Sequence, residues 1–154
     1  MIKVLFICHG NICRSPMCQS VLQDMVERRG IADGFLIDSR ATSREEVGNP
    51  PHYGAVRKLQ AAGISMQPHR ARQITWEDYC SFDYIIGMDD RNIRNLKRIL
   101  KDDPDGKINK LLSFAGTTRD IADPWYTDDF DATYRDVTEG CEAFLRYLDR
   151  KDRI

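Results

Sequence analysis

The sequence predicts an α/β fold, a single-domain doubly wound sheet of about four parallel strands with helices on both faces. Short apolar segments alternate along the chain with segments of helical period. The first apolar segment, residues 2–7, is an almost unbroken run, which is typical of a parallel strand that is buried on both faces. The 154 residues suit one domain with a sizeable core, and no repeat, low-complexity segment or long linker divides them. We therefore expect one domain over residues 1–154.

Periodicity and chain breakers predict the elements that follow the first strand. The expected strands cover residues 35–37, 84–88 and 111–114, and the expected helices cover residues 16–29, 53–62, 92–100 and a short segment from Thr75. Ser15 and Pro16 are typical of an N-cap and a first helical residue, and Thr75 with Asp78 is similar to a capping box. A last helix is predicted by an apolar stripe at steps of three and four, formed by Phe130, Tyr134, Val137, Cys141, Phe144 and Leu148.

The segment between the first strand and the first helix reads Cys8-His9-Gly10-Asn11-Ile12-Cys13-Arg14-Ser15. It has the composition of an anion-binding loop, because the N–H groups of a tight loop and of a helix N-terminus point at bound anions. Gly10 and Asn11 tolerate left-handed backbone best, and the guanidinium of Arg14 can hold two phosphate oxygens. A thiol in such positive surroundings is a thiolate at neutral pH, so Cys8 is a candidate nucleophile. The alternative is a buried strand-end cysteine beside an unrelated surface arginine.

The string CHGNICRSP, preceded by VLFI, resembles the signature of the low molecular weight protein tyrosine phosphatases. Further matching segments fall in the order of that family: Asp38-Ser39, Gly48, residues 69–74, residues 82–86, Met88-Asp89 and Asp123-Pro124-Trp125-Tyr126. The resemblance therefore covers nearly the whole chain. It implies a small enzyme that hydrolyses phosphotyrosine in protein substrates through a cysteinyl-phosphate, with phosphate or another oxyanion as ligand and with no cofactor.

The resemblance also implies the catalytic roles. Cys8 is the nucleophile, the guanidinium of Arg14 holds the phosphate, and Asp123 is the general acid that later acts as base. The remaining phosphate contacts come from the loop residues His9, Gly10, Asn11, Ile12 and Cys13. Without the resemblance, Asp123-Pro124 would be interpreted as an ordinary turn.

The walls of the pocket are expected to differ in character. The resemblance places Trp125 and Tyr126 on either side of a phosphotyrosine ring, and aromatic walls suit such a substrate. The family often has tyrosine where Trp125 stands. Glu45 falls at a variable position of the opposite wall, where a carboxylate would disfavour acidic phosphopeptides and suit basic ones. The alternative is that Glu45 belongs to a solvated loop.

Supporting residues follow from the same resemblance. Asn11 props the loop, the Ser15 hydroxyl donates towards the Cys8 sulfur, and His69 links to the network behind it. Oxidation could join Cys8 to Cys13 and protect the nucleophile, although Cys13 could also be a small core side chain. The remaining expectations are an outward-facing His9 and structural roles for His52, Cys18, Cys80 and Cys141.

Composition limits the remaining function classes. The net charge of −1 gives no pull towards nucleic acid or an anionic membrane. No apolar stretch is long enough to span a membrane, and the N-terminus lacks the pattern of a signal peptide. Five cysteines without a disulfide framework indicate a reducing cytoplasm. Three scattered histidines predict no metal site, and a monomer is the default expectation.

Two other functions compete with the phosphatase. A thiol-based arsenate reductase uses a similar anion loop but needs resolving cysteines, and only Cys80 lies in the middle of this chain. A silent phosphate-binding or redox-sensing module would need Cys8 and Cys13 but no acid such as Asp123. Whether arginine or serine phosphates also fit stays open.

Overall fold

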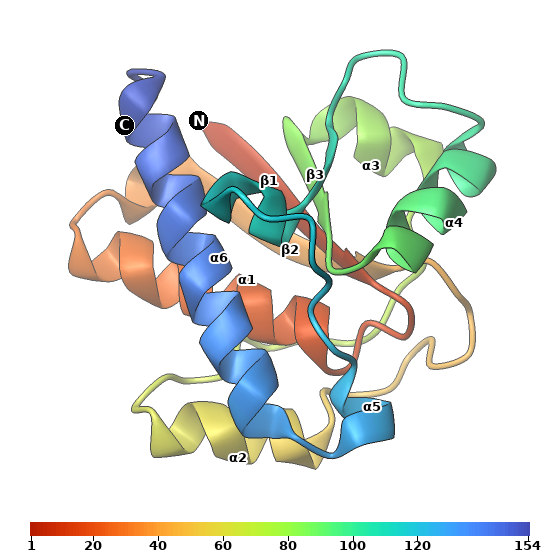
Figure 1. The fold of residues 1–154 in the computed structure, drawn as a ribbon, viewed down its shortest axis with the longest axis vertical. Coiled ribbons are helices and arrows are strands. Elements are labelled where there is room, and N and C mark those ends of the chain that lie inside the picture. The colour runs from red at the N-terminus through yellow and green to blue at the C-terminus, as the bar shows by residue number, and fades with distance from the viewer.

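The computed structural model describes residues 1–154, and Figure 1 shows a single sheet with helices on both sides. Its four strands are all parallel and lie in the order β2-β1-β3-β4. The predicted doubly wound α/β fold is therefore confirmed. The strands are β1 (Ile2–Cys8), β2 (Phe35–Ala41), β3 (Tyr84–Gly87) and β4 (Ile108–Lys110). The helices are α1 (Arg14–Arg28), α2 (Tyr53–Ala61), α3 (Trp76–Ser81), α4 (Asp90–Leu100), α5 (Pro124–Thr127) and α6 (Phe130–Arg150), with short 3₁₀ helices at Ala32–Gly34 and Leu111–Ala115.

The central strand β1 is buried on both faces, which explains its unbroken apolar sequence. Val4 and Phe6 pack in the large core that α1, α2 and α6 complete on one face. Leu5 and Ile7 pack in a second core with residues of α3 and α4. These two helices lie across the sheet from α1 and α6 (Figure 1). Each fully buried side chain of this kind stabilises the fold by about 1.5–3 kcal/mol.

The order of the strands determines where a ligand can bind. β2 lies on one side of β1 and β3 on the other, so the chain changes direction beside β1. In open α/β sheets ligands bind outside the carboxyl ends of the strands at such a switch point. Cys8 is the last residue of β1, so the fold places it at this point.

The fourth strand was predicted at the wrong residues. Residues 111–114 belong to the 3₁₀ helix Leu111–Ala115, and β4 is the preceding segment Ile108–Lys110. Leu111 and Leu112 are completely buried because the 3₁₀ helix packs against α6, where Gly140 leaves room for the Leu111 side chain. A short apolar run suits either a buried strand or a buried helix, and periodicity does not distinguish between them.

Other element boundaries also differ from the prediction. β2 continues past residues 35–37 to Ala41, through polar residues that the hydrophobic pattern does not reveal. α1 begins at Arg14 with Cys13 at the N-cap position, so the prediction of Ser15 as the N-cap was wrong. The Ser15 hydroxyl instead lies beside the Cys8 sulfur. The short helix α5 was not predicted.

Two predicted features are confirmed in detail. Thr75 and Asp78 form a reciprocal capping box at the start of α3. Along α6 the apolar stripe faces the core, where Val137, Cys141, Phe144 and Leu148 are buried.

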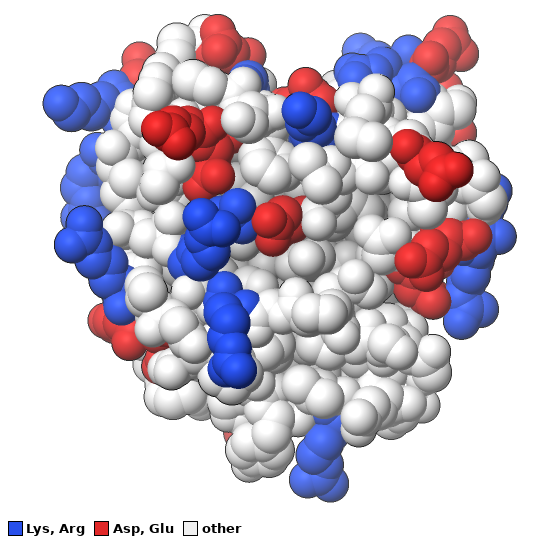
Figure 2. Space-filling view, turned by 180° about the vertical axis from the view of Figure 1, so that it is seen from behind, with Lys and Arg blue, Asp and Glu red and all other residues white.

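The surface carries mixed charge. Figure 2 shows Lys and Arg beside Asp and Glu over the upper half of the rear face, while its lower half is mostly uncharged. No helix of the structure is long and apolar enough to cross a membrane.

Candidate active site

The Cys8 sulfur lies at the centre of a network of donors from its own loop. The backbone N–H of Asn11 donates to it at 3.3 Å, and the hydroxyl of Ser15 lies 3.0 Å away. The side-chain amide of Asn11 donates to the same hydroxyl at 2.8 Å. Because that bond occupies a lone pair of the Ser15 oxygen, the hydroxyl proton is free to point at sulfur. Hydrogen bonds to a charged form favour it, so this arrangement suits a thiolate.

Asn11 holds the loop in shape through both its backbone and its side chain. It is completely buried and has a φ of 61°, a left-handed conformation that asparagine tolerates better than most residues. Its side-chain oxygen accepts from the N–H of Arg72 at 3.1 Å, and its carbonyl accepts from Nε2 of His69 at 2.8 Å. Burial lowers the pKa of His69, so the ring is neutral at pH 7 and carries its proton on Nε2.

Arg14 joins the loop around Cys8 to Asp89, Ile121 and Asp123. Its side chain is only 2% exposed. One terminal nitrogen donates to Asp89 at 2.7 Å and to the carbonyl of Ile121 at 2.8 Å, and the other faces Asp123 at 3.4 Å. Burial by itself lowers the pKa of Arg14, but Cys8, Asp123 and Asp89 outweigh it and raise the pKa. These bonds leave the Nε–H and one Nη2–H of Arg14 available. Together these two groups can make a bidentate contact with an oxyanion.

Asp89 is a site residue that the sequence reasoning missed. One of its oxygens accepts from the N–H of Asn92 and caps α4, and the other accepts from Arg14. A signal was present, because Asp89 closely follows a buried strand that neighbours β1. The carboxyl ends of parallel strands meet at one edge of the sheet.

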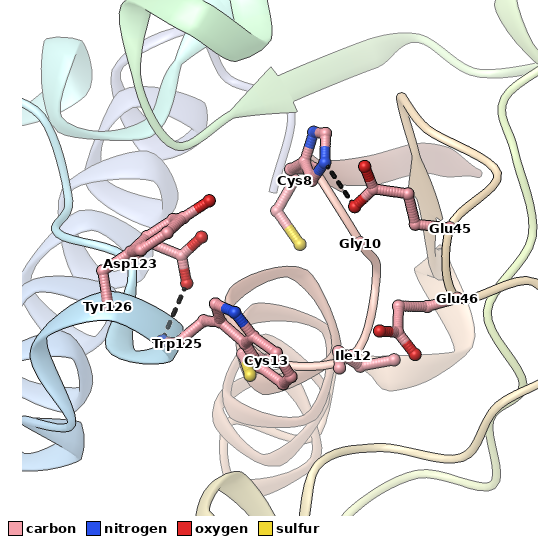
Figure 3. A pocket seen from close by; sticks show the side chains of 10 residues that line it. Cys8, Gly10, Ile12, Cys13, Glu45, Glu46, Asp123, Trp125 and Tyr126 are labelled. Atoms are coloured by element: carbon pink, nitrogen blue, oxygen red, sulfur yellow. Dashed lines mark hydrogen bonds and ion pairs between the residues drawn. The ribbon is translucent and has the colours of Figure 1, made fainter.

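Asp123 reaches the pocket from the opposite side. Figure 3 shows its carboxyl group facing the Cys8 sulfur. One oxygen accepts from the N–H of Trp125 at 3.0 Å, because Asp123 is the N-cap of α5, and the other faces Arg14. The short helix α5 therefore fixes the carboxyl group at the edge of the pocket.

The pocket brings together most of the residues that the sequence singled out. It is lined by Cys8, His9, Gly10, Ile12, Cys13, Glu45, Glu46, Asp123, Trp125 and Tyr126. Trp125 and Tyr126 are 59% and 74% exposed, so their rings are available at the mouth. Asn11, Ser15 and His69 do not line this pocket: Asn11 and Ser15 are completely buried, and His69 contacts the Asn11 carbonyl. Arg14 lines an adjoining pocket with Asp89 and Asp123.

Two features of the rim differ from expectation. The side chain of His9 does not face away from the site; it lines the pocket, and its Nε2 lies 2.9 Å from an oxygen of Glu45. Glu46, which was not among the predicted site residues, also lines the pocket and accepts from the side chain of Asn49 at 2.6 Å. The wall opposite the aromatic residues is therefore acidic.

The loop holds a second cysteine of different character. Cys13 is buried and lines the pocket, and both Cys8 and Cys13 are free thiols. Burial, reinforced by Cys8, raises the pKa of Cys13 well above its usual value. Cys13 is therefore protonated at neutral pH.

The remaining histidine and cysteines lie where packing explains them. Nδ1 of His52 accepts from the N–H of Gly54 and caps α2, and the ring stacks on Phe130. Cys18 and Cys141 are completely buried, and Cys80 is exposed.

Comparisons with known proteins point to one family. The family model described as low molecular weight phosphotyrosine protein phosphatase matches residues 3–153. The low molecular weight phosphotyrosine protein phosphatase of Rattus norvegicus is 44% identical over 148 residues, 93% of each chain. The low molecular weight protein-tyrosine-phosphatase YfkJ of Bacillus subtilis is 35% identical over 156 residues, all of both chains. The crystal structure of YfkJ aligns with a TM-score of 0.93 and 36% identity, covering 98% of this chain and 96% of that one.

Proposed function

The chain belongs to the low molecular weight phosphotyrosine protein phosphatase family, and we propose that it hydrolyses phosphotyrosine in proteins through a phosphocysteine on Cys8. The observation that carries the proposal is the position of Asp123 across the pocket from the Cys8 sulfur. A module that only bound phosphate would need no acid at that position. Arg14 bridges the two halves of the site.

In the first step the Cys8 thiolate attacks phosphorus in line with the tyrosyl oxygen. The S–P bond forms as the P–O bond breaks, and the phenolic oxygen takes its proton from Asp123. The N–H groups of the loop and the free fork of Arg14 hold the three equatorial oxygens. These donors are fixed before the substrate arrives, which is the basis of electrostatic stabilisation.

In the second step the roles reverse. Asp123, now a carboxylate, removes a proton from a water molecule that attacks the phosphorus of the phosphocysteine. The S–P bond breaks, inorganic phosphate leaves, and the electron pair returns to the Cys8 sulfur. The Ser15 hydroxyl and the Asn11 N–H receive that thiolate, so the same two donors support both steps.

The walls of the pocket support a preference among phosphopeptides. Trp125 and Tyr126 offer apolar faces to an aryl phosphate, whereas Glu45 and Glu46 place carboxylates on the opposite side. We propose that peptides with basic residues beside the phosphotyrosine are the better substrates.

Cys13 supports a redox role for the site. Peroxide would convert the Cys8 thiolate to a sulfenic acid, and the Cys13 thiol would then displace water to form a disulfide. We propose that this disulfide spares Cys8 from further oxidation, and that the protein acts as a monomer in the cytoplasm, where its five free thiols stay reduced. Slower recovery of Cys13→Ser from peroxide, measured after adding a thiol reductant, would support the disulfide, and unchanged recovery would exclude it.

The decisive experiment compares Cys8→Ser with Cys80→Ser, which alters an exposed cysteine away from the pocket. p-Nitrophenyl phosphate and a phosphotyrosine peptide are the substrates, with a chelator present. We expect Cys8→Ser to lose hydrolysis of both and Cys80→Ser to match the wild type. Phosphoserine and phosphoarginine peptides define the range of substrates.

The competing functions give different results in the same assay. No phosphate release, together with reduction of arsenate in the presence of a thiol, would favour the reductase. Binding of phosphate or arsenate without turnover would favour the silent module.

A further inference from the structure

One largely covered cation outside the pocket, Lys110, holds the segment that leads to Asp123. Lys110 is the last residue of β4, and its side chain is 9% exposed. Its ammonium group donates to Asp90 at 2.9 Å, to Asp120 at 2.8 Å and to the carbonyl of Thr118. These three bonds use all three of its hydrogens. Lys110 therefore ties residues 118–120 to the first residue of α4.

The same segment is fixed beside the site at the next residues. Asp120 also accepts from the backbone N–H of Asp90 at 3.1 Å. Ile121 donates its N–H to the carbonyl of Met88 at 3.0 Å, and its own carbonyl accepts from Arg14. The residue that Lys110 holds is thus next to a residue that contacts the phosphate-binding arginine, and it lies three positions before the general acid.

We propose that Lys110 is a positioning residue for Asp123, acting through Asp120 and Ile121. The inference rests on the proposed function, because it assigns Asp123 the role of acid. Without the ammonium group, Asp90 and Asp120 would be two neighbouring carboxylates with no shared cation. Their repulsion would move Asp120 away from α4 and shift the residues that follow it.

The charges of Lys110, Asp90 and Asp120 suit a role in positioning the segment and not in global stability. Burial by itself lowers the pKa of Lys110, but the bonds to Asp120 and Asp90 outweigh it, so the pKa is raised and the lysine stays charged. Asp120 and Asp90 are about half exposed or more, so solvent screens the pairs and their contribution to global stability is small. A second bond also holds the segment before Asp123: the Thr133 hydroxyl donates to the carbonyl of Ala122 at 3.0 Å.

The experiment compares Lys110→Met with Lys107→Met. Lys107 is also engaged, donating to the carbonyl of Tyr79 at 2.7 Å, but it makes no contact with the segment before Asp123. We expect Lys110→Met to lower kcat/KM for a phosphotyrosine peptide about tenfold, since small misplacement of a catalytic group costs up to about 10² in rate. The loss on p-nitrophenyl phosphate should be smaller, because its leaving group is a weaker base and needs less protonation. Lys107→Met should stay within about twofold of the wild type on both substrates.

A double-mutant cycle separates positioning from a general structural effect. In an Asp123→Asn background, Lys110→Met should cost nothing more, because the group that it positions is already gone. An equal loss in both backgrounds, or an equal loss on both substrates, would overturn the proposal. Asp120→Ala should reproduce the dependence on leaving group if Lys110 acts through Asp120. Thermal unfolding of each variant identifies any that fail to fold.

The inference and the proposed function fail in different ways. If the wild type released no phosphate, the function itself would be wrong. If Asp123→Asn lost activity while Lys110→Met matched the wild type on both substrates, only the inference about Lys110 would be wrong.

Discussion

The two halves of the pocket are assembled in opposite ways. The half around Cys8 comes from eight consecutive residues, in which Asn11 and Ser15 place their groups on the sulfur through local bonds. The half around Asp123 also depends on Asp89 and Lys110, which come from other elements of the fold. The first half can be recognised in a short string of letters, whereas the second exists only once the sheet has formed.

Arg14 is the one side chain that belongs to both halves, so its replacement should have the largest effect. Arg14→Lys keeps the charge but loses the planar fork and its several fixed donors. We expect kcat/KM for a phosphotyrosine peptide to fall about 10³-fold, similar to the loss of a transition-state donor in other sites.

Steady-state kinetics and phosphate affinity test this expectation. Arg28→Lys is a suitable control, because Arg28 forms only an exposed pair with Asp24 on α1. A loss of less than about fivefold in Arg14→Lys would mean that charge alone suffices and that the fork has no role.

Replacement of Asp123, the proposed general acid, should affect only the half of the pocket around Asp123. Asp123→Asn keeps an oxygen that can accept from Trp125 and so preserves the cap of α5. We expect about a 10²-fold loss of kcat/KM on a phosphotyrosine peptide and a smaller loss on p-nitrophenyl phosphate, because a general acid contributes about 10²–10⁴-fold and matters most for basic leaving groups.

A plot of rate against the leaving-group pKa checks this result. The slope should be steeper in Asp123→Asn than in the wild type. Equal slopes would show that another group supplies the proton.

The difference between the halves also explains what the sequence could predict. The apolar run of β1, the breakers around α2 and the stripe of α6 are local signals, and they gave the fold. Cys8 and Arg14 were found from a local string, but Asp123 is one of many acidic residues and was found only through the resemblance. Asp89 follows a predicted strand, but its contact with Arg14 and the contacts of Lys110 depend on which strand ends become neighbours.

Local signals failed where one pattern permits two structures. Leu111 and Leu112 suit a strand, but they lie in a 3₁₀ helix that packs against α6. Ser15 suits an N-cap, but it lies inside α1 and serves the Cys8 sulfur. His9 was expected to face solvent, and its pairing with Glu45 depends on how β2 ends beside β1.

In the local half, Asn11 should matter for stability as well as for rate. Asn11→Ala would place a Cβ-bearing residue without a polar side chain at a φ of 61° and would remove the bonds to Ser15 and Arg72. We expect a loss of about 2 kcal/mol in the free energy of unfolding.

Urea unfolding of Asn11→Ala and Asn11→Gly separates the two causes. Glycine removes the backbone strain but not the loss of side-chain bonds. A stability of Asn11→Gly equal to that of the wild type would show that the side chain contributes nothing to the loop.

His69 should give the loop a measurable dependence on pH. Burial lowers its pKa in the folded protein, so the unfolded chain binds the proton more readily. The stability associated with the neutral ring is fully present above the unfolded pKa of about 6.5 and is lost as the pH falls through the folded pKa.

His69→Gln can still donate to the Asn11 carbonyl and does not titrate. The loss of Tm on going from pH 7 to pH 5 should therefore be about 1–2 °C smaller in this variant than in the wild type. Parallel curves for the two proteins would show that His69 is not the group responsible.

The smallest effect is expected at the rim, where Glu45 lies 69% exposed beside His9 and its charge is screened by solvent. Glu45→Gln keeps an acceptor for His9 and removes one negative charge from the wall opposite Trp125. The ratio of kcat/KM for a basic phosphotyrosine peptide over an acidic one should fall about threefold at low salt and less at high salt. Glu77→Gln, on α3 and away from the pocket, controls for the change in net charge. If both variants shifted the ratio equally, the preference would come from the overall charge of the protein and not from the wall of the pocket, and the acidic rim would have no part in choosing substrates.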